Sequence, residues 1–399
     1  MRFWIFIASF LYLWSGPAGV AWGGPPAGEP EVVARAAVLA DARTGQVLWA
    51  RNPDLRMYPA STTKILTALV VVMRADLTEK VRVVPEDTNA GGSAIWLQPG
   101  EVLSVEDLLY ALLLNSANDA AEALARHVAG SDQDFARLLN DTALALGATN
   151  THFTNPSGMP DPDHYTTARD LATIARAALA HPVLRRIVAT RTYSIRRQDP
   201  EAVHYLVNHN KLLWRYPGAI GVKTGYTVEA GQCLVAAAQR GERTLIAVVL
   251  GSQGAAVWSD ATVLLDYGFA SFESRQLVPA HLPVSRGPVR YGSRDLVAIT
   301  ADSFTYNFRT GEEPQVRQEL RLDRHLRAPV AAGAKVGELV LFDRDTELGR
   351  VDLVAAEMVP RKAYTRWWFW VLVATGVVAV RRLLRRQGFR YRYRPRYRW

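Results

Sequence analysis

The chain has 399 residues, of which 49% are hydrophobic and 21% charged, and this composition excludes disorder of the whole chain. The net charge of +9 is concentrated at one end, because residues 361–399 contain 12 lysine or arginine residues and no acidic residue. Residues 1–360 carry 35 basic and 38 acidic side chains, a net charge of −3. The basic charge therefore belongs to the C-terminal tail and not to the folded part.

The N-terminus has the pattern of a signal peptide over residues 1–21. Arg2 precedes an apolar run over residues 3–14, and the small residues Gly19-Val20-Ala21 suit a cleavage site. Residues 22–31 are rich in glycine and proline, which indicates a linker. The sequence therefore predicts an exported protein.

Residues 32–275 combine strand and helix patterns. Two apolar stretches, residues 36–40 and 46–50, flank a glycine-containing turn and predict a β-hairpin. From residue 61 to residue 72 the apolar residues recur at helical spacing. We therefore expect an α/β (α+β) domain in which a sheet is flanked by a largely helical region. Further helices are predicted at residues 105–114, 120–128, 134–146, 168–180 and 259–267, and strands at residues 233–238 and 244–250.

Proline and glycine punctuate short strand-like segments over residues 276–360. This pattern predicts a separate small all-β domain. A stalk and a docking surface are both possible roles for it, and composition does not decide between them.

Residues 361–384 form the expected membrane anchor. The 14 uncharged residues 367–380 would span only about 21 Å as a helix, but residues 363–384 suffice if the flanking arginines extend to the interface. A single transmembrane helix is the preferred interpretation, and an interfacial helix is the alternative. The basic segment 385–399 places the C-terminus in the cytoplasm and the preceding domains on the extracytoplasmic face. Its alternating arginine and tyrosine would also suit nucleic acid, but beside an anchor acidic lipid is the expected contact, and no nucleic acid is expected.

Ser61-Thr62-Thr63-Lys64 lies just after Pro59, where a helix should begin. At a spacing of three residues the Ser61 hydroxyl and the Lys64 amine lie on one helix face. A serine is a poor nucleophile until a neighbouring base takes its proton, and a partly desolvated lysine can do so. Alone, this short pattern also fits an ordinary helix start with a solvated lysine.

Two further segments have side chains suited to the same chemistry. Ser116 can relay a proton, and the Asn118 amide can donate to and accept from a substrate peptide group, although a helix cap is the simpler interpretation of either residue. Lys223-Thr224-Gly225 supplies positive charge, a hydroxyl and close backbone access, although it also fits a turn with a solvated lysine. The three motifs together, in this order, are the pattern of penicillin-interacting serine acyltransferases.

The sequence resembles the D-alanyl-D-alanine carboxypeptidases, low-molecular-mass penicillin-binding proteins of peptidase family S11, across roughly residues 32–358. The resemblance implies a serine β-lactamase/transpeptidase-like catalytic domain followed by the β domain. The segments that carry it are residues 58–64 (YPASTTK), 95–101 (IWLQPGE), 112–119 (LLLNSAND), 164–171 (HYTTARDL), 221–227 (GVKTGYT) and 231–234 (GQCL).

The resemblance also implies residue roles. Ser61 would be the acylated nucleophile, Lys64 its base and Ser116 a proton relay. The substrate-binding residues would be Asn118 as a clamp, Lys223 and Thr224 for the terminal carboxylate, Gly225 for close backbone approach, and Tyr226, whose backbone N–H would form the oxyanion hole with that of Ser61.

Some residues fit this pattern less simply. Val257 stands where related enzymes often carry a basic residue that helps to hold the substrate carboxylate. His164 and Asp170 suggest a triad, but with Lys64 as base we expect them to be structural. Cys233, the single cysteine, is expected to be a small buried strand residue. No metal and no cofactor are expected.

The resemblance implies a carboxypeptidase that releases the terminal D-alanine from peptidoglycan stem peptides through an acyl-Ser61 intermediate, and that β-lactams inhibit. A D,D-endopeptidase that cuts cross-links and a non-hydrolytic penicillin sensor remain as alternatives. A β-lactamase is disfavoured because no additional carboxylate motif for fast deacylation is evident.

Overall fold

In the computed structural model, the described residues are 28–197 and 203–390. The predicted signal peptide and the end of the basic tail lie outside them, as does most of the predicted linker. The chain divides into two compact units between Phe272 and Glu273. Each unit is described by itself.

The first unit contains a five-stranded antiparallel sheet with strand order β2-β1-β9-β8-β7. Its central strands consist of buried apolar residues on both faces, which is expected for a sheet covered on each side. Strand β7 lies at the edge, so one side of its backbone faces away from the sheet. The strands are β1 (Ala36–Asp41), β2 (Val47–Arg51), β7 (Ala219–Thr227), β8 (Gly231–Arg240) and β9 (Arg243–Ser252).

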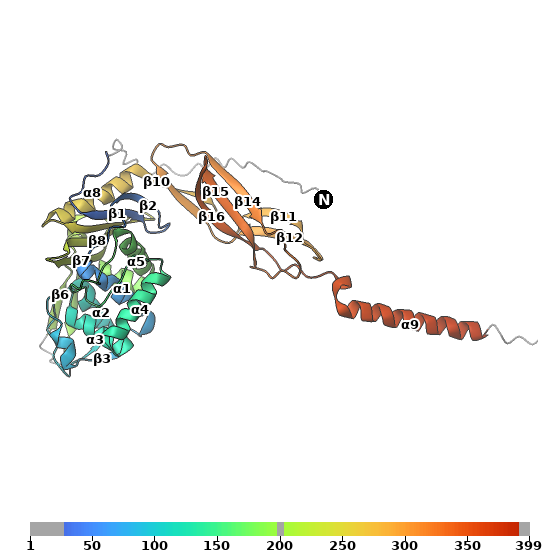
Figure 1. Cartoon of the computed structure of the whole chain (residues 1–399), viewed down its shortest axis with the longest axis horizontal. Helices are drawn as coiled ribbons and strands as arrows, with labels where there is room; N and C mark the ends of the chain where they lie inside the picture. The colour runs from blue at the N-terminus through green and yellow to red at the C-terminus, as the bar shows by residue number, and fades with distance from the viewer. Residues whose placement is uncertain (1–27, 198–202, 391–399) are drawn as a thin grey trace, which may run out of the picture. The chain divides into compact units, whose positions relative to one another are not determined.

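Helices cover both faces of this sheet (Figure 1). Successive strand residues point to opposite faces, so Val38 packs into the core shared with the helical region while Leu39 packs against α8 (Ala256–Ser271). Gly268 allows α8 to approach closely, because a Cβ at this position would lie 2.6 Å from a Leu245 methyl group. The alternating burial therefore specifies two cores, one on each face.

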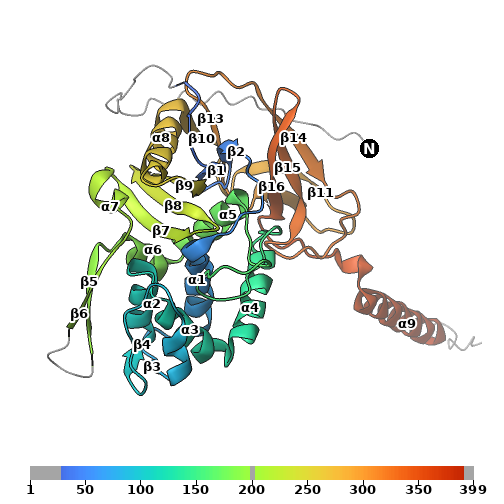
Figure 2. The same cartoon turned by 60° about the vertical axis from the view of Figure 1, so that its left-hand side comes forward.

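The helical region surrounds α1 (Lys64–Arg74), in which residues 64–71 are all buried (Figure 2). Contacts from α2 to α6 enclose it. Ser61-Thr62-Thr63-Lys64 therefore leads directly into a central, buried helix. The other elements are η1 (Ala60–Thr63), β3 (Lys80–Arg82), η2 (Pro85–Asn89), β4 (Val102–Ser104), α2 (Val105–Leu114), α3 (Asn118–Ala129), α4 (Asp132–Ala145), α5 (Ala168–Ala180), α6 (Pro182–Ala189), β5 (Thr192–Arg196), β6 (Val203–Val207) and α7 (Leu212–Arg215).

The second unit contains an all-β domain, as the sequence predicts. Its main sheet has the order β11-β12-β16-β15-β14, and β10 pairs with β13 in a smaller sheet. Leu339, Leu341 and Leu353 bury one side of the main sheet in a core of its own. The strands are β10 (Phe272–Val278), β11 (Pro283–Pro288), β12 (Asp295–Thr300), β13 (Phe304–Arg309), β14 (Val316–Leu322), β15 (Lys335–Asp343) and β16 (Thr346–Ala355).

A short turn, η3 (Ala363–Thr365), precedes the C-terminal helix α9 (Trp367–Arg390). Over Trp367–Arg385 this helix is long and apolar enough to cross a membrane, and none of that window is buried in the protein. Nineteen helical residues rise about 28 Å, close to the thickness of a bilayer core. Length and composition therefore agree with the predicted anchor.

Candidate active site

Ser61 lies in the short 3-10 turn η1 and not in the first turn of an α-helix, where the sequence places it. The Thr62 hydroxyl donates to the Pro59 carbonyl at 2.6 Å, and the Thr63 hydroxyl donates to the Ala60 carbonyl at 2.9 Å. These bonds fix the turn, and α1 begins at Lys64. Ser61 is half-buried whereas its immediate neighbours are buried, so it is the residue of this turn that a substrate can reach.

Lys64 is fully buried, and its amine lies at the centre of the site. Its Nζ lies 3.1 Å from Ser61 Oγ, 2.6 Å from Asn118 Oδ1 and 2.5 Å from the Ser157 carbonyl oxygen. Burial, and then the positive charge of Lys223, hold the pKa of Lys64 well below its usual range. A neutral amine donates two hydrogen bonds and accepts one, so these three contacts suit a base that receives the Ser61 proton.

The second motif begins just after α2. Ser116 is buried and has a left-handed backbone conformation with φ of 62°. Two residues later Asn118 opens α3; its backbone N–H donates to the Ser93 carbonyl at 2.7 Å, and its side-chain amide donates to the Gly91 carbonyl at 2.8 Å. The tight turn therefore brings the Asn118 amide onto Lys64, with Ser116 two residues away along the chain.

The third motif lies on the edge strand β7. A Cβ on Gly225 would lie 2.9 Å from the backbone nitrogen of Ser61, so only glycine lets the strand pass this close to the serine turn. Lys223 is buried, which lowers its pKa to about 7. Thr224 lies beside it and Tyr226, after Gly225, is 60% exposed. The strand thus places the predicted carboxylate-binding residues and the Tyr226 backbone along one side of the Ser61 turn.

His164 supports the turn that carries Ser61 through a contact with Thr63. Its Nδ1 accepts from the Thr154 backbone N–H at 3.0 Å, which leaves the proton on Nε2, 2.9 Å from the Thr63 hydroxyl. Burial lowers the pKa of His164 to about 4, so it is neutral at physiological pH. The Asp170 carboxylate accepts instead from the Asn150 N–H at 2.7 Å. The two side chains therefore hold separate segments and do not form a triad with Ser61.

Glu122 is a charged residue near Lys64 that sequence reasoning missed. It lies one helical turn after Asn118 on the same face of α3, and its Oε2 is buried with no hydrogen-bond partner among the described residues. Burial and the neighbouring Asp132 raise the pKa of Glu122 to about 8, and Lys64 acts in the opposite direction. The four-residue spacing from Asn118 was the available signal.

Other groups with catalytic potential are inert here. Cys233 is buried in β8, and burial raises the pKa of its thiol to about 11, as expected for a packing residue. Within the described ranges, no cluster of three His, Cys, Asp or Glu side chains could hold a metal ion.

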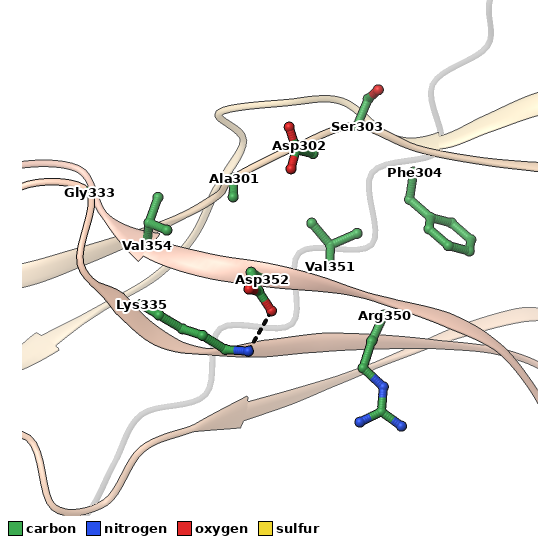
Figure 3. Close-up of a pocket in the computed structure, with 10 residues that line it drawn as sticks. All are labelled: Ala301, Asp302, Ser303, Phe304, Gly333, Lys335, Arg350, Val351, Asp352 and Val354. Carbon is green, nitrogen blue, oxygen red and sulfur yellow. Dashed lines mark ion pairs between the residues drawn. The ribbon is translucent and has the colours of Figure 1, made fainter. Parts of the chain in front are cut away.

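A pocket in the second unit does not offer a second candidate (Figure 3). It has a volume of about 420 Å³, but both of its basic side chains are already held in ion pairs. Lys335 Nζ lies 2.7 Å from the Asp352 carboxylate, and Arg350 pairs with Glu347 at 2.8 Å. The predicted catalytic residues all lie in the first unit.

Two family models match the chain. One is described as D-alanyl-D-alanine carboxypeptidase and matches residues 25–254. The other is described as penicillin-binding protein 5, C-terminal domain, and matches residues 272–361. Both units are therefore covered.

Known proteins match over most of the length. The D-alanyl-D-alanine carboxypeptidase DacF of Bacillus subtilis is 34% identical over 338 residues, which is 83% of this chain and 86% of the relative. The structure of penicillin-binding protein 5 from Haemophilus influenzae has a TM-score of 0.74 at 30% identity, covering 84% of this chain and 100% of that chain. A DD-transpeptidase from Streptomyces has a TM-score of 0.59 at 36% identity, covering 61% of this chain and 100% of its own.

Proposed function

Because this chain belongs to the D-alanyl-D-alanine carboxypeptidase family, we propose that it removes the terminal D-alanine of peptidoglycan stem peptides through an ester formed on Ser61. The observation that carries the assignment of Ser61 is the buried Lys64 amine, 3.1 Å from the Ser61 hydroxyl. The lowered pKa of Lys64 supports a neutral amine at the pH of the cell envelope.

In the proposed acylation, Lys64 takes the Ser61 proton while Oγ attacks the carbonyl carbon of the penultimate D-alanine. The N–H groups of Ser61 and Tyr226 stabilise the oxyanion, each with a few kcal/mol, typically about 3. The close approach of Gly225 to the Ser61 backbone supports this pairing of donors from the serine turn and β7.

The leaving D-alanine carries a carboxylate, which Lys223 and Thr224 would bind. Opposite charge raises the pKa of a lysine, so the carboxylate would return Lys223, with a pKa of about 7 in the free enzyme, to its ammonium form. As the C–N bond breaks, the proton taken by Lys64 reaches the leaving amine through Ser116. Water then hydrolyses the Ser61 ester and restores the hydroxyl.

A second candidate is transfer of the acyl group to an amine instead of water. The likeness to the Streptomyces DD-transpeptidase favours it, since such an enzyme passes through the same ester. The two reactions differ only in the acceptor.

We also propose that α9 anchors the chain in the cytoplasmic membrane with the catalytic unit on the extracytoplasmic face. The apolar window of α9 and the arginines that follow Val380 support this orientation.

The test uses the full-length chain in detergent micelles and a pentapeptide ending in D-Ala-D-Ala. We expect D-alanine release that Ser61→Ala and penicillin both abolish, with Ser259→Ala as a matched control because that hydroxyl bonds its own helix at the Ala256 carbonyl. Penicillin bound to Ser61 without D-alanine release would refute the carboxypeptidase reaction and leave transfer, endopeptidase cleavage or penicillin sensing. Adding an amine acceptor and looking for a new peptide bond identifies transfer.

A further inference from the structure

Trp96 is held in an unusual conformation near the proposed active site. Its side chain is 72% exposed, although Ile95 and Leu97 on either side are buried. Its φ is 57°, a left-handed conformation that a bulky residue rarely adopts. Such a conformation persists only where surrounding interactions fix it.

Buried charged groups fix the backbone around Trp96. The Asp119 carboxylate accepts from the N–H of Ile95 at 3.2 Å and from that of Leu97 at 3.0 Å. Arg197 donates to the Ile95 carbonyl at 2.8 Å and to the Trp96 carbonyl at 3.0 Å. Arg197 is held in turn by Glu101 at 2.5 Å. The backbone that carries the indole is therefore preorganised, which reduces the entropy lost when a ligand binds to it.

The same segment contacts Asn118 of the proposed active site. Asn118, whose amide oxygen lies against Lys64, donates its backbone N–H to the Ser93 carbonyl. The three residues from Ser93 to Trp96 can span at most about 10 Å. An extended substrate whose scissile bond lies at Ser61 would cover a distance of this size within a few residues. Trp96 is thus within reach of the part of the substrate upstream of that bond.

The surface around the indole suits an uncharged, hydroxyl-rich ligand. Residues 88–100 contain no charged side chain, and their exposed polar residues are Asn89, Ser93 and Gln98, with a hydroxyl and two amides. The nearby Arg197 is paired with Glu101. A peptide that carries carboxylates and amines would be better bound by charged partners. The electron-rich face of an indole instead suits the C–H face of a sugar ring.

We propose that Trp96 is a sugar-binding platform, which binds the N-acetylated sugar attached to the stem peptide. This inference rests on the proposed function, because it assigns the sugar to the substrate of Ser61. Trp96 would contribute to binding in the ground state and the transition state alike. Its loss should therefore raise KM more than it lowers kcat.

The test compares a disaccharide-pentapeptide with the same pentapeptide lacking the sugar, using the full-length chain in detergent. We expect Trp96→Ala to lower kcat/KM about 5- to 10-fold for the sugar-bearing substrate and to leave the free pentapeptide unchanged. Trp96→Phe should recover part of the loss. Trp214→Ala is the matched control, since Trp214 is also exposed but its ring packs by Arg191, with the guanidinium 5.9 Å away.

Equal losses on the two substrates would overturn the proposal and make Trp96 a support for the Asn118 loop or a peptide contact. An unchanged kcat/KM on both would overturn it as well. Penicillin acylation of Trp96→Ala at the wild-type rate would show that the Ser61 site is intact. If the wild-type chain releases no D-alanine, the proposed function fails; the sugar contact is then tested separately by co-sedimentation with peptide-free glycan strands, which Trp96→Ala should weaken.

Discussion

Replacing Asp132 by asparagine should move the pH dependence of acylation through a residue that does not contact Ser61. Burial and Asp132 together raise the pKa of Glu122 to about 8, so at pH 7 the Glu122 carboxyl is mostly protonated. The negative charge of Glu122, when present, raises the pKa of Lys64. A protonated Glu122 therefore leaves Lys64 free to act as a neutral base.

In Asp132→Asn the pKa of Glu122 falls, so a larger fraction of Glu122 is ionised at neutral pH and stabilises the Lys64 ammonium. The resulting rise in the pKa of Lys64 lowers its neutral fraction, and with it the acylation rate, severalfold on the acid side of the profile. The other charges near Lys64, from Lys223 and Asp119, are unchanged. The acid limb should therefore move to higher pH without a change in the plateau.

The assay is the second-order rate of acylation by a fluorescent penicillin between pH 5 and 10, which does not depend on deacylation. Glu122→Gln cannot ionise and should keep the rate at pH 7. The double variant Glu122→Gln/Asp132→Asn should regain the Glu122→Gln profile, because Asp132 acts through Glu122. An unshifted acid limb in Asp132→Asn, or a double variant that still resembles Asp132→Asn, would refute this reasoning.

Three further predictions concern the central residues. Lys64→Arg should reduce penicillin acylation at least about 10²-fold, because a guanidinium stays charged and cannot take the Ser61 proton; an active arginine variant would contradict a lysine base. Gly225→Ala should reduce acylation about 10²-fold by pushing β7 away from the Ser61 N–H. The control Gly287→Ala, where the added Cβ meets open space, should have no effect on acylation. Equal acylation rates for the two variants would disprove the steric argument. Lys223→Met should raise the free energy of unfolding by about 1 kcal/mol or more below pH 7, since the folded-state pKa of Lys223, about 7, lies below its unfolded value near 10.5. The gain in stability should fade between pH 7 and 10.5. Denaturant titrations at pH 6 and 9.5 that give equal gains would contradict this prediction.

Local signals in the sequence predict several elements closely. Helices at residues 105–114 and 168–180 have the bounds of α2 and α5, because apolar periodicity coincides there with true N-caps. The Ser104 and Thr167 side chains accept from the N–H groups of Asp107 and Asp170. The serine motif is less regular, since the hydroxyls of Thr62 and Thr63 bond backwards to carbonyls and impose a 3-10 turn before α1.

Other features depend on contacts between distant segments and are not visible in periodicity. Gly225 can approach Ser61 because β7 is the edge strand of the sheet. The position of β7 at the edge depends on the order in which all five strands pair, which local periodicity does not reveal. Glu122 has the sequence signature of an exposed helix residue, and only its burial in the fold and the neighbouring Asp132 raise its pKa. Arg197 and Glu101 are nearly one hundred residues apart, yet they fix the same loop. Tertiary burial converts these ordinary charged residues into parts of the site.

The charges around Ser61 are best understood together. Lys64, Lys223 and Glu122 would each be ionised in water near neutral pH, but burial shifts the pKa of every one of them toward its uncharged form. Two amines and one carboxylic acid whose pKa values are shifted toward their neutral forms can be buried at a lower desolvation cost than the same groups fully ionised. In the proposed reaction, ionisation would accompany catalysis: a substrate carboxylate would favour the charged form of Lys223, and proton transfer from Ser61 would charge Lys64. The low polarity that makes these residues unusual is therefore what lets a lysine act as the base.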